Sequence, residues 1–123
     1  MEFLTREGTR VGGHYSSAVV AGPLVFTAGQ VPRDADRNIV GATIAEQTVA
    51  ALKNVEGILR EANATLTDIV QVRVHLSDLS LTAEFNRAYA EFFGAHKPAR
   101  TLVGSALNGV MVEIDAIAYV TPA

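Results

Sequence analysis

The most constraining feature of the sequence is a strict alternation of side chains over residues 110–120. A period of two is typical of a β-strand, in which successive side chains point to opposite faces of the sheet. One face of this predicted strand is wholly apolar, with Val110, Val112, Ile114, Ala116 and Ala118. The other face carries Met111, Glu113, Asp115, Ile117 and Tyr119. Two carboxylates therefore lie among apolar neighbours, where burial costs several kcal/mol unless each acid is paired or hydrogen-bonded.

Turn and cap signals divide the rest of the chain into short elements. Apolar runs at residues 17–21 and 24–28 flank Gly22-Pro23, which predicts a β-hairpin. Thr43 followed by Glu46 forms a capping-box pattern ahead of apolar residues that recur every three or four positions, so a helix is expected from Thr43 to about Asn63. Residues 32–38 are polar and aperiodic, which indicates a loop.

The second half of the chain carries the same kinds of strand, helix and turn signals. Residues 70–76 alternate as a half-buried strand, with Val70 expected on the apolar face, and residues 80–93 predict a helix that ends at Gly94. Residues 97–100 are expected to form an exit loop because of Pro98. The dipeptide Asn108-Gly109 favours a two-residue hairpin turn between strands at 101–105 and 110–120.

This order of elements predicts one α+β domain over residues 1–123, with a mainly antiparallel sheet and two helices on one face. Two helices cover only one face of such a sheet. The last strand is largely apolar on both faces, so the second face needs another cover. Self-association supplies it most simply, and a homo-oligomer is expected.

Composition excludes several functional classes. The formal charge is −3 and no basic run is present, which disfavours a nucleic-acid partner. The chain has no cysteine, and its three histidines match no zinc spacing, so no metal site is expected. The N-terminus does not resemble a signal peptide, and no apolar run approaches the roughly 20 residues that span a bilayer. We expect a cytoplasmic protein without a membrane partner.

The carboxylate face contains the residues that chemistry could use. Glu113 and Asp115 are either functional or simply exposed acids on an edge strand. In a hairpin closed by Asn108-Gly109, Arg100 would share the carboxylate face but would lie four residues, roughly 13 Å, from the position opposite Glu113. Arg100 is therefore a surface charge, an ion-pair partner at a subunit boundary, or part of a site completed across that boundary.

Six segments, in order along nearly the whole chain, resemble motifs of the RidA/YjgF family, formerly called the endoribonuclease L-PSP family. They are residues 13–18 (GHYSSA), 27–32 (TAGQVP), 47–54 (QTVAALKN), 86–93 (NRAYAEFF), 98–101 (PART) and 112–118 (VEIDAIA). The resemblance implies a chorismate-mutase-like fold and a homotrimer with clefts between subunits. It also implies hydrolysis of reactive enamines and imines, such as those derived from 2-aminoacrylate, to 2-keto acids and ammonia, without a cofactor.

The same resemblance implies roles for individual residues. Arg100 would bind the substrate carboxylate through its planar guanidinium fork. Glu113 would activate the attacking water and help to protonate the departing amine. The backbone of Gly29 would line the cleft, while Tyr15 and Asn86 would shape the pocket wall.

Four positions depart from the family pattern. His14 stands where proline is usual, Ser17 replaces glutamine, Ala28 replaces serine or threonine, and Leu102 occupies a position that is cysteine in some members. His14, Ala28 and Leu102 are expected to line the pocket, so these departures bear on the choice of substrate and on activity.

Three alternatives to a general imine deaminase remain at this point. The first is a pathway-specific deaminase of a larger acid of the aminomuconate type. The second is a non-catalytic module that binds a small carboxylate and uses Arg100 but not Glu113. RNA cleavage, which the family's older name implies, is disfavoured by the charge of −3.

Overall fold

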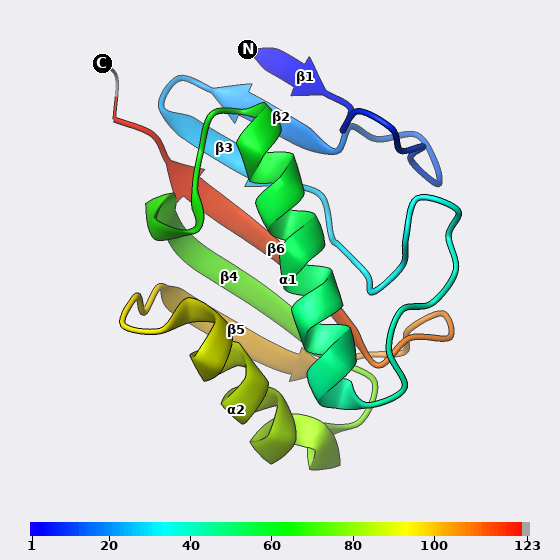
Figure 1. Cartoon of the computed structure of the whole chain (residues 1–123). Coiled ribbons are helices and arrows are strands. Elements are labelled where there is room, and N and C mark those ends of the chain that lie inside the picture. The colour runs from blue at the N-terminus through cyan, green and yellow to red at the C-terminus, as the bar shows by residue number, and fades with distance from the viewer. Residues whose placement is uncertain (122–123) are drawn as a thin grey trace.

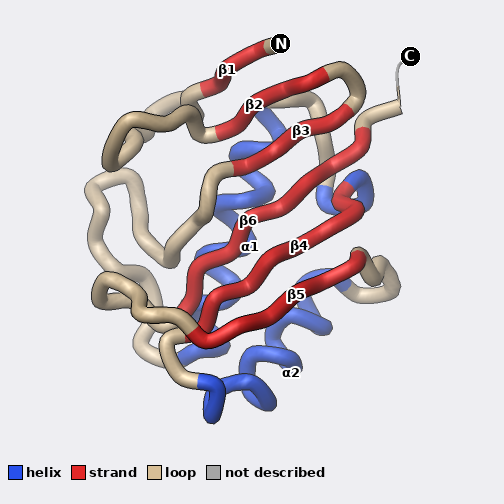
Figure 2. Tube along the Cα trace, turned by 180° about the vertical axis from the view of Figure 1, so that it is seen from behind, coloured by secondary structure: helices blue, strands red, loops and turns tan. Residues whose placement is uncertain are grey.

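Six strands form one mixed sheet, and both helices pack on the same face of it (Figures 1 and 2). The computed structural model describes residues 1–121. The strand order is β1-β2-β3-β6-β4-β5, and every neighbouring pair is antiparallel except β4 and β5. The strands are β1 (Glu2–Leu4), β2 (Ala18–Ala21), β3 (Leu24–Thr27), β4 (Ile69–Leu76), β5 (Ala99–Gly104) and β6 (Val112–Tyr119). The helices are α1 (Ile44–Glu61) and α2 (Thr82–Phe93), with short 3-10 turns at Leu66–Asp68 and Leu79–Leu81.

Helix α1 begins where the capping box predicted. The Thr43 Oγ accepts a hydrogen bond from the Glu46 amide at 3.1 Å, and Glu46 Oε1 accepts one from the Thr43 amide at 3.1 Å. These two bonds satisfy amide groups that have no partner within the helix. The helix then buries Leu52, Val55 and Leu59 completely against the sheet, and so the predicted apolar stripe is confirmed.

The Glu46 cap should make stability depend on pH. Hydrogen bonds from the Ala42 and Thr43 amides hold the pKa of Glu46 below its ordinary value of 4.5. A lowered folded-state pKa stabilises the fold above the unfolded pKa, and the contribution is lost as pH falls through the folded value. We expect the difference in unfolding free energy between wild type and Glu46→Gln, measured in urea, to shrink as pH falls below about 4.5. Parallel pH curves would contradict this, and Glu91→Gln, an exposed α2 residue, is the control.

The predicted hairpin between the last two strands is wrong. Strand β5 pairs in parallel with β4, and β6 inserts between β3 and β4. Gly109 does adopt the positive φ of a turn, 80°, but the turn lies in the loop between β5 and β6. Helix α2 makes the crossover that a parallel β4–β5 pair requires. The pairing of β6 with β3 on one edge and with β4 on the other therefore determines the strand order, although Asn108-Gly109 favours a hairpin between β5 and β6.

Two boundaries also differ from expectation. Strand β5 already begins at Ala99, so Arg100 lies in a strand and not in an exit loop. At the start of β4 the register shifts between Ile69 and Gln71, which is a β-bulge. Ile69 is consequently buried, and Val70, expected on the apolar face, is 48% exposed.

The sheet face opposite the helices carries a row of apolar side chains. The register aligns Phe3, Val19, Phe26 and Ile117 across β1, β2, β3 and β6. Ile117 lies on the face opposite the buried β6 residues, so the whole row faces away from α1 and α2. Among residues 1–121, no helix is both long and apolar enough to cross a bilayer.

Candidate functional site

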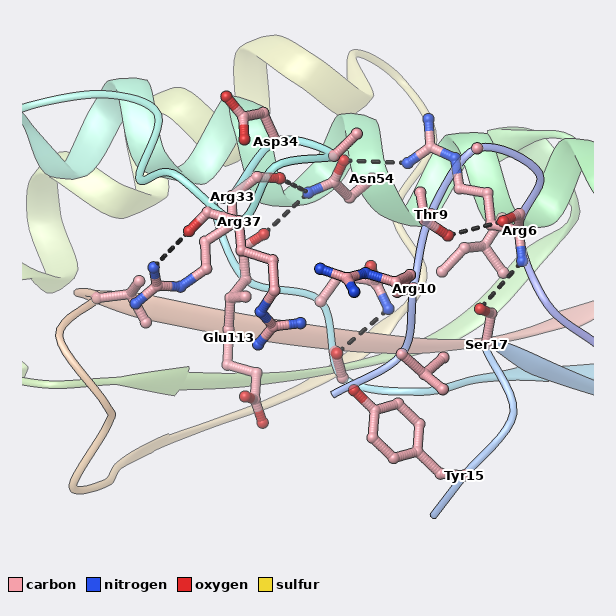
Figure 3. A pocket seen from close by; sticks show the side chains of 18 of the residues that line it. Arg6, Thr9, Arg10, Tyr15, Ser17, Arg33, Asp34, Arg37, Asn54 and Glu113 are labelled. Carbon is pink, nitrogen blue, oxygen red and sulfur yellow. Dashed lines mark hydrogen bonds between the residues drawn. The ribbon is translucent and has the colours of Figure 1, made fainter. Parts of the chain in front are cut away.

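A cleft of about 580 Å³ opens where β6 passes the segment that follows β3 (Figure 3). Gln30 and Ile114 exchange backbone hydrogen bonds of 2.7 and 2.9 Å, which fixes this segment beside β6. Glu113 therefore points into the cleft from β6, and the N-terminal loop with Tyr15 closes the other side. The structure thus places three predicted site residues, Tyr15, Gly29 and Glu113, in one cleft.

Gly29 lies directly beneath the Glu113 side chain. A Cβ atom at position 29 would lie 2.8 Å from Glu113 Oε2 and 3.0 Å from its Cδ, closer than real Cβ atoms approach other atoms. The missing side chain therefore leaves the space that the carboxylate occupies. Glu113 itself is only partly buried, so its carboxylate can reach a molecule bound in the cleft.

The N-terminal loop is tied to the rest of the cleft by short polar contacts. The Tyr15 hydroxyl accepts a hydrogen bond from the Gly12 amide at 3.0 Å, which directs the ring along the loop. The Ser17 hydroxyl is buried and accepts one from the Arg6 amide at 3.1 Å. Ser17, one of the departures from the family pattern, thus anchors the loop as well as lining the cleft.

Arg100 lies on the other side of the sheet, so the expectation that it shares the carboxylate face is wrong. Its register partner in β4 is Val72, which faces the helices. Its guanidinium carbon lies 4.8 Å from the ring centroid of Tyr89 and 5.5 Å from that of Phe85, both on α2. Such cation–π contacts hold the guanidinium over the two rings.

The surroundings of Tyr89 show how closely this pair is packed. The residue is only 9% exposed, and its hydroxyl has no hydrogen-bond partner among the described residues. Burial raises the pKa of Tyr89, and the charge of Arg100 acts in the opposite direction. The hydroxyl therefore stays protonated at neutral pH beside the guanidinium.

Arg100 and Glu113 do not meet within one chain. They lie two strand spacings apart, roughly 10 Å, and are offset by three residues along the strands, roughly another 10 Å; their side chains also leave opposite faces of the sheet. Asn86 is exposed on α2, and Leu102 follows Arg100 on the helix-facing side of β5. One chain therefore carries two separate groups of predicted site residues, one around Glu113 and one around Arg100, which are called half-sites below.

The remaining predicted residues take other places. His14 is exposed in the N-terminal loop, and Ala28 donates its amide to the Ser17 carbonyl at 2.8 Å, but the cleft lining includes neither. Asp115 forms an ion pair with Arg73 at 2.9 Å across β6 and β4. His75, opposite Glu113 in the register, hydrogen-bonds through Nδ1 to the Ser105 hydroxyl at 2.8 Å.

Comparisons with known proteins bear on the family and the fold of this chain. The family model described as Endoribonuclease L-PSP matches residues 7–120. A RutC family protein of Pyrococcus abyssi is 42% identical over 118 residues, which is 94% of this chain and 93% of that protein. The chain belongs to the RidA/YjgF family. Yeast YEO7 has a solved structure with a TM-score of 0.91 and 32% identity, covering 98% of each chain.

A second solved structure of similar fold was determined with a bound ligand. TdcF of E. coli, crystallised with bound serine, has a TM-score of 0.87 and 32% identity over 97% of this chain and 98% of that one. The two-helix, mixed-sheet architecture is thus that of the family.

Four side chains of this RidA/YjgF member were missed by sequence reasoning. Phe85 and Tyr89, the aromatic platform of Arg100, lie in the helix predicted over residues 80–93, but no contact with Arg100 was expected. Arg10 and Arg37 line the cleft from two loops and were not considered. The spacing of Phe85 and Tyr89 indicates a helix, but it does not show which strand packs against that helix. Arg10 and Arg37 lie in loops, where no periodic pattern marks a residue. A single sequence therefore reveals neither pair.

Proposed function

We propose that this protein hydrolyses 2-imino acids and their enamine tautomers to 2-keto acids and ammonia. The observation that carries the proposal is the split site: an acid over a glycine in a cleft, and an arginine seated on aromatic rings on the other face of the sheet, at the edge strand β5. Membership of the RidA/YjgF family supports the reaction class. The serine bound to TdcF supports a small, amino-acid-like ligand.

The proposed active unit is a homotrimer in which one subunit supplies Arg100 and its neighbour supplies Glu113. Arg100 lies on β5, whose outer edge has no partner strand within the described chain. On the open face, Phe3, Phe26 and Tyr119 remain 67%, 39% and 47% exposed. A chain that leaves large apolar groups exposed on one sheet face is expected to cover them by association.

The chemistry follows from the charges at the two half-sites. Arg100 would bind the substrate carboxylate with two parallel N–H···O bonds. Starting from the protonated imine, the Glu113 carboxylate would accept a proton from water as the water oxygen bonds to the imine carbon, and the C=N electron pair would move to the nitrogen, which becomes an amine. Glu113 would then return that proton to the amine nitrogen. As the C–N bond breaks, Glu113 would accept the proton of the new hydroxyl group, the C=O bond would form, and ammonia would leave and take up this proton as ammonium.

The direct experiment measures ammonia release from freshly generated 2-aminoacrylate with wild type and Glu113→Gln. Positioned acid–base groups contribute roughly 10²- to 10⁴-fold, so the variant should lose about that much of kcat/KM. Gln keeps the shape of the side chain but cannot accept a proton, so binding of the pyruvate product should persist.

Two results would overturn the proposal. An unchanged decay rate of the imine in the presence of wild type would exclude hydrolysis of that substrate. Equal rates for wild type and Glu113→Gln would remove Glu113 from the chemistry. If pyruvate bound without any hydrolysis, the protein would instead be a module that binds small carboxylates.

A further inference from the structure

The cleft beside Glu113 has the opposite charge from the whole molecule. Four arginines line it against three acids, Glu7, Asp34 and Glu113, which leaves one net positive charge, whereas the chain carries −3. The arginines are Arg6, Arg10, Arg33 and Arg37. A cleft lined by one excess sign of charge attracts a ligand of the other sign.

Two of these arginines are used in holding the structure together. Arg33 donates to the Arg37 carbonyl at 2.7 Å and to the Asn108 carbonyl at 3.2 Å. Arg6 donates to the Asn54 Oδ1 at 3.1 Å and packs on Gly57, where a Cβ atom would lie only 2.4 Å from the guanidinium carbon. Neither guanidinium is free to turn toward a ligand.

Arg10 and Arg37 are different. Among residues 1–121, neither side chain makes a hydrogen bond or an ion pair. Figure 3 shows both side chains extending into the cleft that Glu113 also lines. They come from separate loops, the N-terminal loop and the turn after β3, and converge on the same space.

The backbone holds Arg37 in place at a conformational cost. Its φ is 66°, a left-handed conformation that side-chain-bearing residues rarely adopt because the Cβ atom crowds the following carbonyl oxygen. The turn is held by Asp34, whose Oδ1 accepts the amides of Asp36 and Asn38 at 3.0 and 2.9 Å. The guanidinium rests against Gly12, where a Cβ atom would lie 3.1 Å from Nη2. Glycine or asparagine would suit this turn better, so arginine here points to a use for the guanidinium.

We propose that Arg10 and Arg37 form a subsite for a second carboxylate, at the end of the substrate remote from the imine. The inference rests on the proposed function: the first carboxylate is bound by Arg100, the imine carbon lies at Glu113, and the chain of the substrate extends along the cleft. The preferred substrates are then dicarboxylic 2-imino acids. The volume of about 580 Å³ is more than a three-carbon imine fills. One net positive charge matches one carboxylate better than a phosphate dianion.

The test compares two imino acids produced in the assay by an amino-acid oxidase, one from glutamate and one from norleucine. The two are similar in length, but only the first ends in a carboxylate. Hydrogen bonds from Arg10 and Arg37 to the second carboxylate should favour the glutamate imine over the norleucine imine. From the usual strength of hydrogen bonds to charged groups, we expect a preference of about 10- to 100-fold in kcat/KM. In the double variant Arg10→Gln/Arg37→Asn, we expect the ratio to fall to near one while the norleucine imine keeps its rate. Asparagine tolerates a positive φ, so the turn should persist.

The matched control is Arg60→Gln, which removes one positive charge from an exposed position of α1, where the ion pair with Glu56 is long at 3.9 Å. It should leave the preference unchanged. Equal rates for both imines in wild type would overturn the subsite. So would a preference that survives in the double variant. In both cases the proposed hydrolysis itself would stand.

If wild type hydrolyses neither imine, the proposed function fails and binding decides on the subsite. Calorimetry with 2-oxoglutarate and 2-oxohexanoate, the corresponding keto acids, should then show tighter binding of the diacid, lost in the double variant. Equal binding would overturn the subsite. Binding of an RNA oligonucleotide that depends on Arg10 and Arg37, without binding of 2-oxoglutarate, would replace it with a site for nucleic-acid phosphates.

Discussion

Mixed oligomers of two inactive variants, Arg100→Ala and Glu113→Gln, are expected to recover about a quarter of the wild-type imine hydrolysis. Alone, Arg100→Ala should lower kcat/KM by about 100-fold or more, because truncation leaves the substrate carboxylate without its partner. Glu113→Gln should lose a similar factor through the missing proton acceptor. Recovery of activity in the mixture requires that the two residues act from different subunits.

The recovery follows from the position of the half-sites. Arg100 faces the helices at the β5 edge, and Glu113 lies in a cleft on the other side of the sheet. In a ring of identical head-to-tail interfaces, random mixing of equal amounts places an intact Arg100 opposite an intact Glu113 at about one interface in four. Unfolding and refolding the two variants together provides the random mixture.

The control is the double variant Arg100→Ala/Glu113→Gln mixed with wild type. Intact sites then require two adjacent wild-type subunits, so activity should again be about a quarter at equal amounts. If the two single variants showed no recovery while this control retained about half of the wild-type activity, both residues would have to act from one subunit. That result would exclude the split site.

Replacement of Gly29 by alanine is expected to lower kcat/KM by about 10- to 100-fold, since displacements of about 1 Å at a catalytic group have effects of that size. The added methyl would lie 2.8 Å from Glu113 Oε2, so the carboxylate has to move. Gly29 is exposed and has no positive φ, so the backbone accepts alanine and the melting temperature should change little. Steady-state kinetics together with thermal unfolding separates these two effects.

A double-mutant cycle with Glu113→Asp identifies the cause. Aspartate is one methylene shorter than glutamate, so its carboxylate should lie farther from the added methyl group at position 29 and be displaced less. The loss in Gly29→Ala/Glu113→Asp should therefore be smaller than the product of the two single losses, which is the signature of residues in contact. Strictly multiplicative losses would show that Gly29 acts through something other than the Glu113 carboxylate.

Much of the fold was predictable because its signals are local. The capping box at Thr43 and Glu46 places the start of α1, since both hydrogen bonds form within one turn of the chain. Gly22-Pro23 marks the β2–β3 hairpin. The alternation over residues 110–120 correctly separated the buried side chains of β6 from Glu113 and Asp115, because side-chain direction in a strand depends only on position.

The pairing of the last strands was not predictable in the same way. Asn108-Gly109 is a turn in both the sequence and the structure, but a turn does not determine which strands become neighbours. Strand β6 found partners on both edges, β3 and β4, and β5 was left at the outside of the sheet. Because of this strand order, Arg100 lies against the rings of Phe85 and Tyr89 and not on the carboxylate face, where a β5–β6 hairpin would have placed it.

The sequence by itself thus determined most of the elements, the apolar faces and, through its motifs, the family, while the roles of Arg100 and Glu113 stay predictions. Only the tertiary structure decided that these two residues lie in separate half-sites, and that Arg10 and Arg37 converge beside Glu113. The physical reason is the separation along the chain of the residues that interact. Caps, turns and alternation are set by neighbours in the chain, whereas strand order and the meeting of two loops depend on contacts between residues far apart in the sequence.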